Sequence, residues 1–373
     1  MKKRILSVLM AFALALTLLP AEAIASGSSQ GDEPITLTKI DQELITDWID
    51  FGPAVTSADL DLRPGYFAYP EAAGNAEKWI DRRAVDSVAR NFYEMLEKGS
   101  MPANAEKGTT GLLINDQNYE IKTGAADIID VSGSTLTSAT RDLIDKAEVG
   151  DVVTLKTKVT IKNTGNSETQ KIVTYSCVCV MTSNTGISKD TQDGIITAFY
   201  AFDRDHPEAF WLDGGIRLAS AGYSSSDGTA KNCLFVVLKS DDGFDLRDSD
   251  YRNAAAITSG ITARDNKINE ILTTELRAKT RSEQINELNR WLVTKNSYNT
   301  QAAANKSPTN GGNLPWECLS ALKAGTSVEP VCEGYARAFK VLCDQLGIPC
   351  VLVDGQAESY TGQGQKGPHM WNY

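Results

Sequence analysis

One stretch near the C-terminus, "EPVCEGYARAFKVLCDQLGIPC" at residues 329–350, restricts the fold more than any other part of the chain. Its apolar residues recur at helical spacing from Cys332 onward, which predicts a helix with one buried face formed by Tyr335, Phe339, Leu342 and Leu346. Gly347 and Pro349 end that helix, and the apolar run that follows predicts a short strand. A cysteine therefore opens a helix that leads into a buried strand.

A thiol in the first turn of a helix has two interpretations. It can pack as a small apolar residue, or it can act as a nucleophile, because the unpaired N–H groups of the first turn favour the thiolate. His369 follows a glycine-rich loop in the extended segment "PHMWNY". An imidazole beside the sulfur can accept the thiol proton and donate it to a leaving group. If the two groups meet, Cys332 is expected to alkylate well below pH 8.

Three motifs together resemble the transglutaminase-like superfamily, whose core is papain-like: Cys-Glu-Gly-Tyr-Ala, Gly-Ile-Pro and His-x-Trp-Asn. The resemblance begins at about Trp316, and residues 290–299, "RWLVTKNSYN", are similar to the helix that commonly precedes that core. Residues 198–215 look more loosely like the N-terminal extension of larger exported bacterial members. The resemblance implies an α+β core in which the cysteine-bearing helix packs on an antiparallel sheet.

The resemblance also implies a role for each matching residue. Cys332 is then the nucleophile and His369 its acid–base partner, while Trp371 and Asn372 form the wall beside the histidine and bind substrate. Trp316, upstream of the thiol, is a further candidate for substrate binding. No metal ligand and no cofactor is implied.

The chemistry that follows is acyl transfer through a thioester. The thiolate attacks an amide carbonyl, and water or a primary amine then takes the acyl group. A cysteine protease and a crosslinking protein-glutamine acyltransferase both fit, with a protein or cell-wall peptide as substrate. The third catalytic residue of the family, an acid on the strand after the histidine, is expected beyond Tyr373, so the domain is expected to be incomplete here. The alternative is an inactive domain that binds or scaffolds at the cell surface.

The first 25 residues predict a secretory signal peptide. A basic start at residues 2–4 precedes the apolar run 5–19, and small residues before Ser26 offer a cleavage site after Ala25. Cleavage takes the net charge from -11 to -13, because the leader carries three basic residues and one acidic residue. Such an acidic chain is a poor match for nucleic acid, and no later run is long enough to span a membrane. A secreted or extracellular, surface-associated protein is expected.

The mature chain is expected to form two domains after a flexible leader at residues 26–35. An N-terminal α+β extension occupies residues 36–247, and the transglutaminase-like domain occupies residues 248–373. Alternating apolar residues predict a β-hairpin from residues 151–163 and 168–182. Further periodic segments predict a helix at 75–99, a strand at 118–124, and helix over 248–296 with a break near 279–282.

The remaining reactive side chains are predicted to be structural. Four cysteines fit buried positions as small hydrophobes: Cys177, Cys179, Cys343 and Cys350. His206 lacks any neighbouring ligand cluster. The acidic segment 240–250 departs from calcium-loop spacing and is predicted to be a solvated loop with a helix cap.

Overall fold

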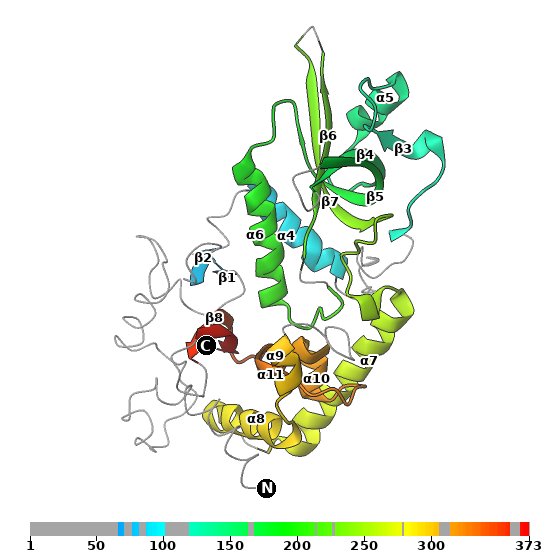
Figure 1. The fold of residues 1–373 in the computed structure, drawn as a ribbon. Helices are drawn as coiled ribbons and strands as arrows, with labels where there is room; N and C mark the ends of the chain where they lie inside the picture. Colours follow the sequence, from blue (N-terminus) through cyan, green and yellow to red (C-terminus); the bar gives the residue numbers. More distant parts are fainter. Residues whose placement is uncertain are drawn as a thin grey trace. The chain divides into compact units, whose positions relative to one another are not determined.

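The computed structural model describes residues 66–70, 77–81, 87–100, 119–162, 168–212, 215–225, 228–277, 280–305, 314–358 and 366–372. The predicted signal peptide and flexible leader lie outside these residues. The chain forms two compact units (Figure 1). Unit 1 contains Met1–Asp81, Arg204–Phe210 and Ser259–Tyr373, and unit 2 contains Arg82–Asp203 and Trp211–Thr258. The predicted domain boundary after residue 247 falls inside unit 2.

Unit 2 is built on a curled five-stranded sheet with the order β3-β4-β5-β7-β6 (Figure 1). Its strands are β3 (Ile128–Asp130), β4 (Val152–Lys162), β5 (Glu168–Ser183), β6 (Leu218–Ser224) and β7 (Ala230–Ser240). Only β3 and β4 run parallel; the other described neighbours are antiparallel. The predicted hairpin is confirmed as β4 and β5, whose register runs from Val152 opposite Val178 to Lys162 opposite Glu168.

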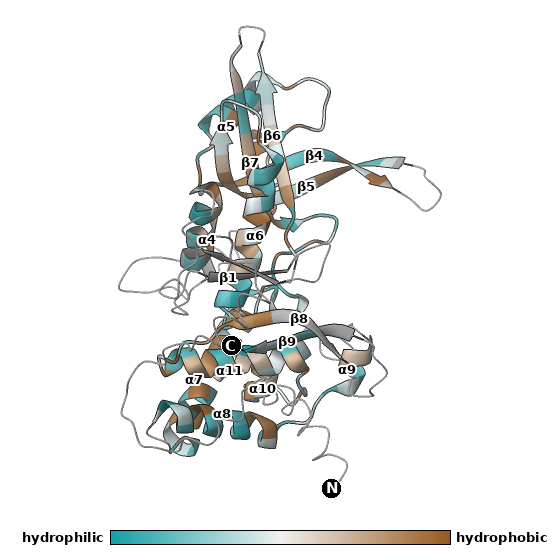
Figure 2. Cartoon of the chain, turned by 90° about the vertical axis from the view of Figure 1, so that its left-hand side faces the viewer, coloured by the Kyte–Doolittle hydropathy of each residue, from teal (hydrophilic) through white to brown (hydrophobic). Residues whose placement is uncertain are grey.

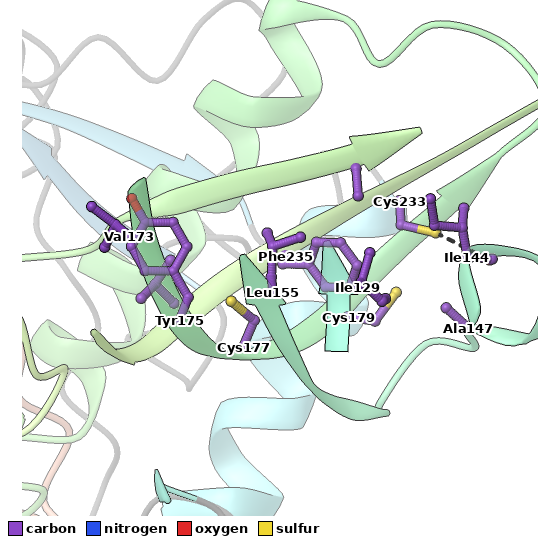
Figure 3. Close-up of a cluster of buried hydrophobic side chains, with 12 residues drawn as sticks. Ile129, Ile144, Ala147, Leu155, Val173, Tyr175, Cys177, Cys179, Cys233 and Phe235 are labelled. Carbon is purple, nitrogen blue, oxygen red and sulfur yellow. Dashed lines mark hydrogen bonds between the residues drawn. The ribbon is translucent and has the colours of Figure 1, made fainter. Parts of the chain in front are cut away.

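One hydrophobic cluster of unit 2 lies between this sheet and α5 (Ser138–Lys146), which presents the buried Ile144 to it (Figure 3). The predicted burial of Cys177 and Cys179 is confirmed, because both lie in this cluster with no exposed surface. Cys233 of β7 belongs to the same cluster. Two further helices, α4 (Ser87–Ser100) and α6 (Lys189–Asp205), meet through an edge-on contact of Tyr93 and Phe202, with ring centroids 5.7 Å apart.

Two local predictions in the N-terminal half are wrong. The predicted helix at 75–99 begins only at Ser87, because Glu77–Asp81 instead forms β2 and pairs with β1 (Tyr66–Pro70). Pairing with a second strand satisfies the backbone of this stretch and outweighs its weak helical periodicity. The predicted strand at 118–124 is displaced to β3, which follows the short 3₁₀ turn Ala125–Asp127 and buries Ile129 against β4.

The acidic segment 240–250 is exposed at residues 241–243 and 249–250 but buried at residues 245–248, so the predicted solvated loop is wrong for its central part. Asp245 and Arg247 are 3 % and 1 % exposed and form an ion pair, and the guanidinium carbon lies 3.7 Å from the centre of the Tyr119 ring. This partnership compensates for burying the charges. The predicted cap is confirmed, since Asp248 accepts a hydrogen bond from the Asp250 backbone N–H at the 3₁₀ turn Ser249–Tyr251.

The long helical stretch is interrupted where the sequence predicts. The helix α7 (Ala254–Glu270) continues into a π-helical turn, Ile271–Glu275, and α8 (Arg281–Lys295) starts anew. Thr280 and Glu283 form a reciprocal capping box that fixes the start of α8. The short helix α9 (Thr300–Asn305) follows.

The centre of unit 1 is α11 (Cys332–Gln345), which confirms the predicted cysteine-opened helix. It packs against the 3₁₀ turn Leu314–Trp316, α10 (Cys318–Leu322), α8 and an antiparallel pair of strands. That pair is β8 (Leu352–Glu358) and β9 (Lys366–Asn372). Figure 2 colours the first residues of β8 as hydrophobic, in keeping with the burial of Leu352 and Val353. The predicted α+β architecture, a cysteine-bearing helix on antiparallel strands, is confirmed.

Candidate active site

Cys332 is the first residue of α11, and its helix end has no side-chain cap. The N-cap residue Val331 has an extended backbone and accepts the first helical hydrogen bond from the Tyr335 N–H at 3.2 Å, but its side chain caps nothing. The N–H groups of a first turn have no partner within the helix. They are therefore the donors that a negative charge at this position requires.

Gly334, in the middle of the Cys-Glu-Gly-Tyr-Ala motif, lets this helix end approach its neighbours closely. A Cβ atom on Gly334 would lie 2.5 Å from the Pro315 carbonyl oxygen and 2.8 Å from the Ser320 Oγ. That same Pro315 oxygen accepts a hydrogen bond of 2.9 Å from the Val331 N–H. The glycine is thus a packing requirement that brings the helix start against the turn carrying Trp316.

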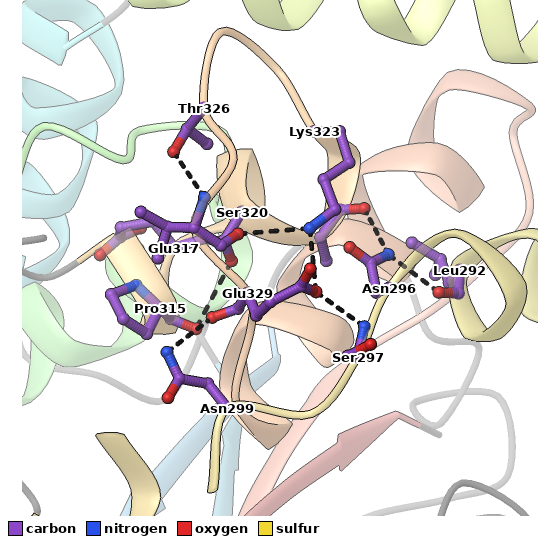
Figure 4. Close-up of polar contacts among 12 residues, drawn as sticks. Leu292, Asn296, Ser297, Asn299, Pro315, Glu317, Ser320, Lys323, Thr326 and Glu329 are labelled. Atoms are coloured by element: carbon purple, nitrogen blue, oxygen red, sulfur yellow. Dashed lines mark hydrogen bonds and ion pairs between the residues drawn. The ribbon is translucent and has the colours of Figure 1, made fainter. Parts of the chain in front are cut away.

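The segment between α8 and α9 is tied to the residues just before α11 (Figure 4). Glu329 accepts a hydrogen bond of 2.7 Å from the Ser297 N–H and forms an ion pair of 2.9 Å with Lys323. Asn299 donates its backbone N–H to the Pro330 carbonyl at 2.9 Å. Residues on both sides of position 298 are therefore held against the start of α11.

The end of α8 is anchored in the same way. Asn296 is 7 % exposed, and its Nδ2 donates to the Leu292 carbonyl at 2.8 Å and to the Ala321 carbonyl at 2.9 Å (Figure 4). These two bonds link the last turn of α8 to α10. The backbone at Asn296 is extended, and these bonds fix the direction in which the chain leaves α8.

Tyr298 lies between these anchors and contacts Cys332 directly. Its ring stacks on that of Tyr335, with centroids 6.5 Å apart and planes 4° from parallel. Its hydroxyl is hydrogen-bonded to the Cys332 sulfur and to the Cys332 backbone N–H. The sequence interpretation assigned no role to Tyr298. The sequence indicated Tyr298 only through its place in the segment "RWLVTKNSYN", which resembles the helix before the core. No spacing rule connects that segment with Cys332.

The strand that carries the predicted histidine is fastened to α11 by its alternate residues. Met370 is 3 % exposed and packs with Ala336 and Leu352. Asn372 donates its Nδ2 to the Ala336 carbonyl at 2.9 Å and to the Cys350 Sγ at 3.4 Å. The Met370 backbone N–H is hydrogen-bonded to the Cys332 sulfur. His369 is therefore the sequence neighbour of the residue whose backbone contacts the thiol.

His369 and Trp371 lie on the other face of β9, because side chains alternate along a strand. Their rings are 6.1 Å apart and 24° from parallel. Both are half-buried, and burial lowers the pKa of His369. Within the described part of the chain, the hydrogen bonds of the Cys332 sulfur are with Tyr298 and with the backbones of Met370 and Glu333, so the pairing of Cys332 with His369 stays a prediction.

The sign of the Cys332 pKa shift is opposite to the expected one. Burial raises the pKa of Cys332, and this exceeds the opposing effect of the hydrogen bonds from Met370, Tyr298 and the Glu333 backbone. The Glu333 carboxylate raises it further, although Arg337 pairs with that carboxylate at 2.8 Å. The first turn of the helix favours the thiolate, but the loss of water around the sulfur costs more.

The other reactive side chains are buried elsewhere. Of the seven cysteines, all within the described residues, six are buried and Cys332 is half-buried. This confirms the predicted burial of Cys343 and Cys350. His206 lies 2.9 Å from Glu208 through Nδ1, and Trp316 is half-buried in the turn beside the start of α11. Cys332 is therefore the most accessible thiol of the chain.

Comparison with known proteins agrees with this geometry. Residues 270–373 match the family model of the transglutaminase-like superfamily, and this range contains α8, α11, β8 and β9. No curated protein matches the chain. The matched range ends on the strand of His369 and begins just before the helix that positions Tyr298. Residues 270–373 are thus similar to the transglutaminase-like superfamily.

Proposed function

We propose that this protein is an exported cysteine enzyme that transfers acyl groups from amides through a thioester on Cys332. One observation carries the proposal: a half-buried thiol at an uncapped helix end, bonded to the backbone of the strand that bears His369. The match of residues 270–373 to a superfamily of cysteine enzymes supports it. The substrate class is a protein or a cell-wall peptide.

The reaction proceeds in two steps. In the first, His369 takes the Cys332 proton, the sulfur forms a bond to the amide carbonyl carbon, and the carbonyl π pair moves to oxygen. Collapse of that intermediate breaks the C–N bond, and the amine leaves with the proton from His369. In the second, water or a primary amine attacks the thioester, the C–S bond breaks, and the thiol recovers its proton. Trp316, Trp371 and Asn372 contact the substrate in this scheme.

The acyl-enzyme is the species that tests this proposal. The full chain is incubated with a glutamine-containing peptide, quenched in acid and measured by intact-mass spectrometry. The expected result is release of ammonia together with an added acyl mass that maps to Cys332. A fluorescent primary amine is then expected to take this acyl group from the sulfur and form a labelled amide product. The Cys332→Ala variant is the control. Absence of the adduct across a panel of peptide amides would remove the basis for catalysis.

A second function is favoured by one observation. Burial raises the pKa of Cys332 and lowers that of His369, so both groups are neutral at pH 7 in the described conformation. A domain that has lost its chemistry and binds cell-surface peptides accounts for this pattern. It predicts peptide binding that is equal in the wild-type chain and in Cys332→Ala, with no ammonia released by either.

Localisation belongs to the same proposal. The basic and apolar start of the chain, followed by a cleavage site after Ala25, supports export. In the parts of the chain that the structure describes, no helix has the length and apolar character needed to cross a bilayer. The exported protein is proposed to act in the extracellular space or at the cell surface.

A further inference from the structure

We infer that Asn372 is a positioning residue for acyl transfer, which holds the strand of His369 in place along the helix of Cys332. This inference rests on the proposed function. It adds to the substrate contact proposed for Asn372 a role that neither the sequence motifs nor the comparison assigns. The observation behind it is that the Asn372 amide donates to the Ala336 carbonyl at 2.9 Å and to the Cys350 Sγ at 3.4 Å.

The orientation of the Asn372 amide follows from its two partners. A carbonyl oxygen only accepts hydrogen bonds and a thiol sulfur accepts them weakly, so the side that faces Ala336 and Cys350 is the NH₂ group. The Ala336 carbonyl lies within α11 and has a second lone pair besides the one that the helix uses. The bond from Asn372 therefore ties β9 to α11 without opening the helix.

This bond lies near both reacting groups along their own elements. Ala336 follows Cys332 by four residues, which is about one turn or about 6 Å of helix. His369 precedes Asn372 by three residues, which is about 10 Å of extended strand. Because β9 is paired with β8 throughout this stretch, a shift of the strand at Asn372 moves His369 by nearly the same distance.

Apolar packing between the two elements leaves this register open. Ala336, Leu352 and Met370 form a small buried cluster between α11, β8 and β9, and contacts of this kind are non-directional. A hydrogen bond has a preferred distance and angle. The bond between Asn372 and the Ala336 carbonyl therefore fixes how far β9 is displaced along α11.

The position of His369 matters most while Cys332 is a neutral thiol. Burial raises the pKa of Cys332, so at pH 7 its proton must pass to His369 as the S–C bond forms and the carbonyl π pair moves to oxygen. A base takes a proton at a heavy-atom distance of about 2.6–3.2 Å, and a misplacement of about 1 Å can cost about 100-fold in rate. Above the thiol pKa, solvent removes the proton and the imidazole is no longer needed.

A double-mutant cycle tests whether Asn372 acts through His369. Acylation of the full chain by p-nitrophenyl acetate at pH 7 is followed by p-nitrophenolate release, with the rate of Cys332→Ala subtracted. The acetyl group carries no peptide, so contacts with a peptide substrate do not enter this rate. Asn372→Ala is expected to lower the rate constant at least about tenfold. In the His369→Gln background the same substitution is expected to change it less than about twofold, because no imidazole is left to position.

The dependence on pH gives a second measurement. The rate constant for alkylation of Cys332 by iodoacetamide at its high-pH plateau is expected to change less than about threefold in Asn372→Ala, because the thiolate needs no base. Asn372→Leu keeps the approximate size of the side chain and lacks the donor, and it is expected to match Asn372→Ala at pH 7 and at the plateau. Circular dichroism shows that each variant is folded at the assay temperature, and Asn372→Leu carries the test if Asn372→Ala is unfolded.

Lys340→Met is the matched control. Lys340 donates its Nζ to the Cys350 carbonyl at 3.1 Å, so it ties the chain just before β8 to the same helix. The substitution removes that bond but leaves the bond between Asn372 and Ala336. Acylation at pH 7 is therefore expected to stay within about threefold of the wild-type rate.

The outcomes separate this inference from the function on which it depends. If the wild-type chain shows no acylation that depends on Cys332 and His369, the proposed function fails and the inference falls with it. If the wild type acylates and the Asn372 variants acylate equally well, only the inference is overturned. The same holds if they lose the same factor with and without His369, or if Lys340→Met loses as much as they do.

Discussion

At Cys332, two physical effects of opposite sign act on one sulfur. Hydrogen bonds from Met370, Tyr298 and the helix end stabilise the thiolate, while burial favours the neutral thiol. Burial is the larger effect, so the resting group is a thiol. Under the proposed function, we expect a histidine to take the proton during attack rather than to form an ion pair beforehand.

The pH profile of alkylation reports this balance. Because burial raises the pKa of Cys332, its thiolate fraction grows only as the pH rises past the usual thiol range of about 8.5. We expect the iodoacetamide rate at Cys332 to reach half its maximum above pH 9, and the six buried cysteines to label more slowly in the native protein. Peptide mapping by mass spectrometry at each pH measures this. A half-maximum below pH 8 would instead reveal an ion pair with an imidazolium.

His369 makes stability depend on pH in the acidic range. Burial lowers its pKa from 6.5 in the folded state, so the unfolded chain binds the proton more readily. The stability from the neutral imidazole is complete above pH 6.5 and is lost as the pH falls through the folded-state pKa. We expect His369→Gln to lose less unfolding free energy between pH 7 and pH 5 than wild type, measured by urea unfolding. Equal losses would show that His369 makes no contribution.

At the scale of elements, the start of α11 is positioned by close packing rather than by a cap. The turn Leu314–Trp316, α10 and the residues before α11 meet around a position that has no room for a side chain. Glu329, through its ion pair and hydrogen bond, and Asn296, through its side-chain hydrogen bond, then hold the segment of Tyr298 at the same junction. The site is an assembly of element ends, which explains why no single segment contains it.

Substitution of the glycine at this junction tests the packing. Gly334→Ala places a methyl group against Pro315 and Ser320, and such overpacking costs about 1–3 kcal/mol. Gly194→Ala is the matched helical control: its Cβ would lie 3.5 Å from Ala89, an ordinary contact, and alanine improves helix propensity by up to about 1 kcal/mol. Amide hydrogen exchange is expected to speed up in α11 of the first variant and to stay equal or slow down in α6 of the second. Unchanged exchange in α11 would mean that the junction adapts freely.

At the scale of the whole molecule, the two units interleave along the chain. Unit 2 interrupts unit 1 twice, before and after Arg204–Phe210, so each unit is closed by segments that are distant in sequence. The domain matched by the family model lies wholly within unit 1, since it begins at residue 270. The proposed catalytic residues and the five-stranded sheet therefore belong to different units.

The predicted leader has a consequence for the mature protein as a whole. Cleavage after Ala25 leaves Ser26 as the first residue and a net charge of -13. Intact-mass and N-terminal analysis of protein collected from the medium or the cell surface is expected to show this start. A chain that keeps its first 25 residues and stays inside the cell would contradict both the signal peptide and the extracellular site of action.

Features set by neighbours in the sequence were predictable. The helix that starts at Cys332, the hairpin of β4 and β5, and the break before Thr280 all follow from periodicity and turn residues, because these act over a few positions. Features that depend on burial and on distant partners were not. The strand β2 replaced a predicted helix because β1 supplied its hydrogen bonds, and Tyr298 reached Cys332 through anchors at Glu329 and Pro330. The raised pKa of Cys332 has the same origin, since the water that a sulfur loses is decided by everything folded around it.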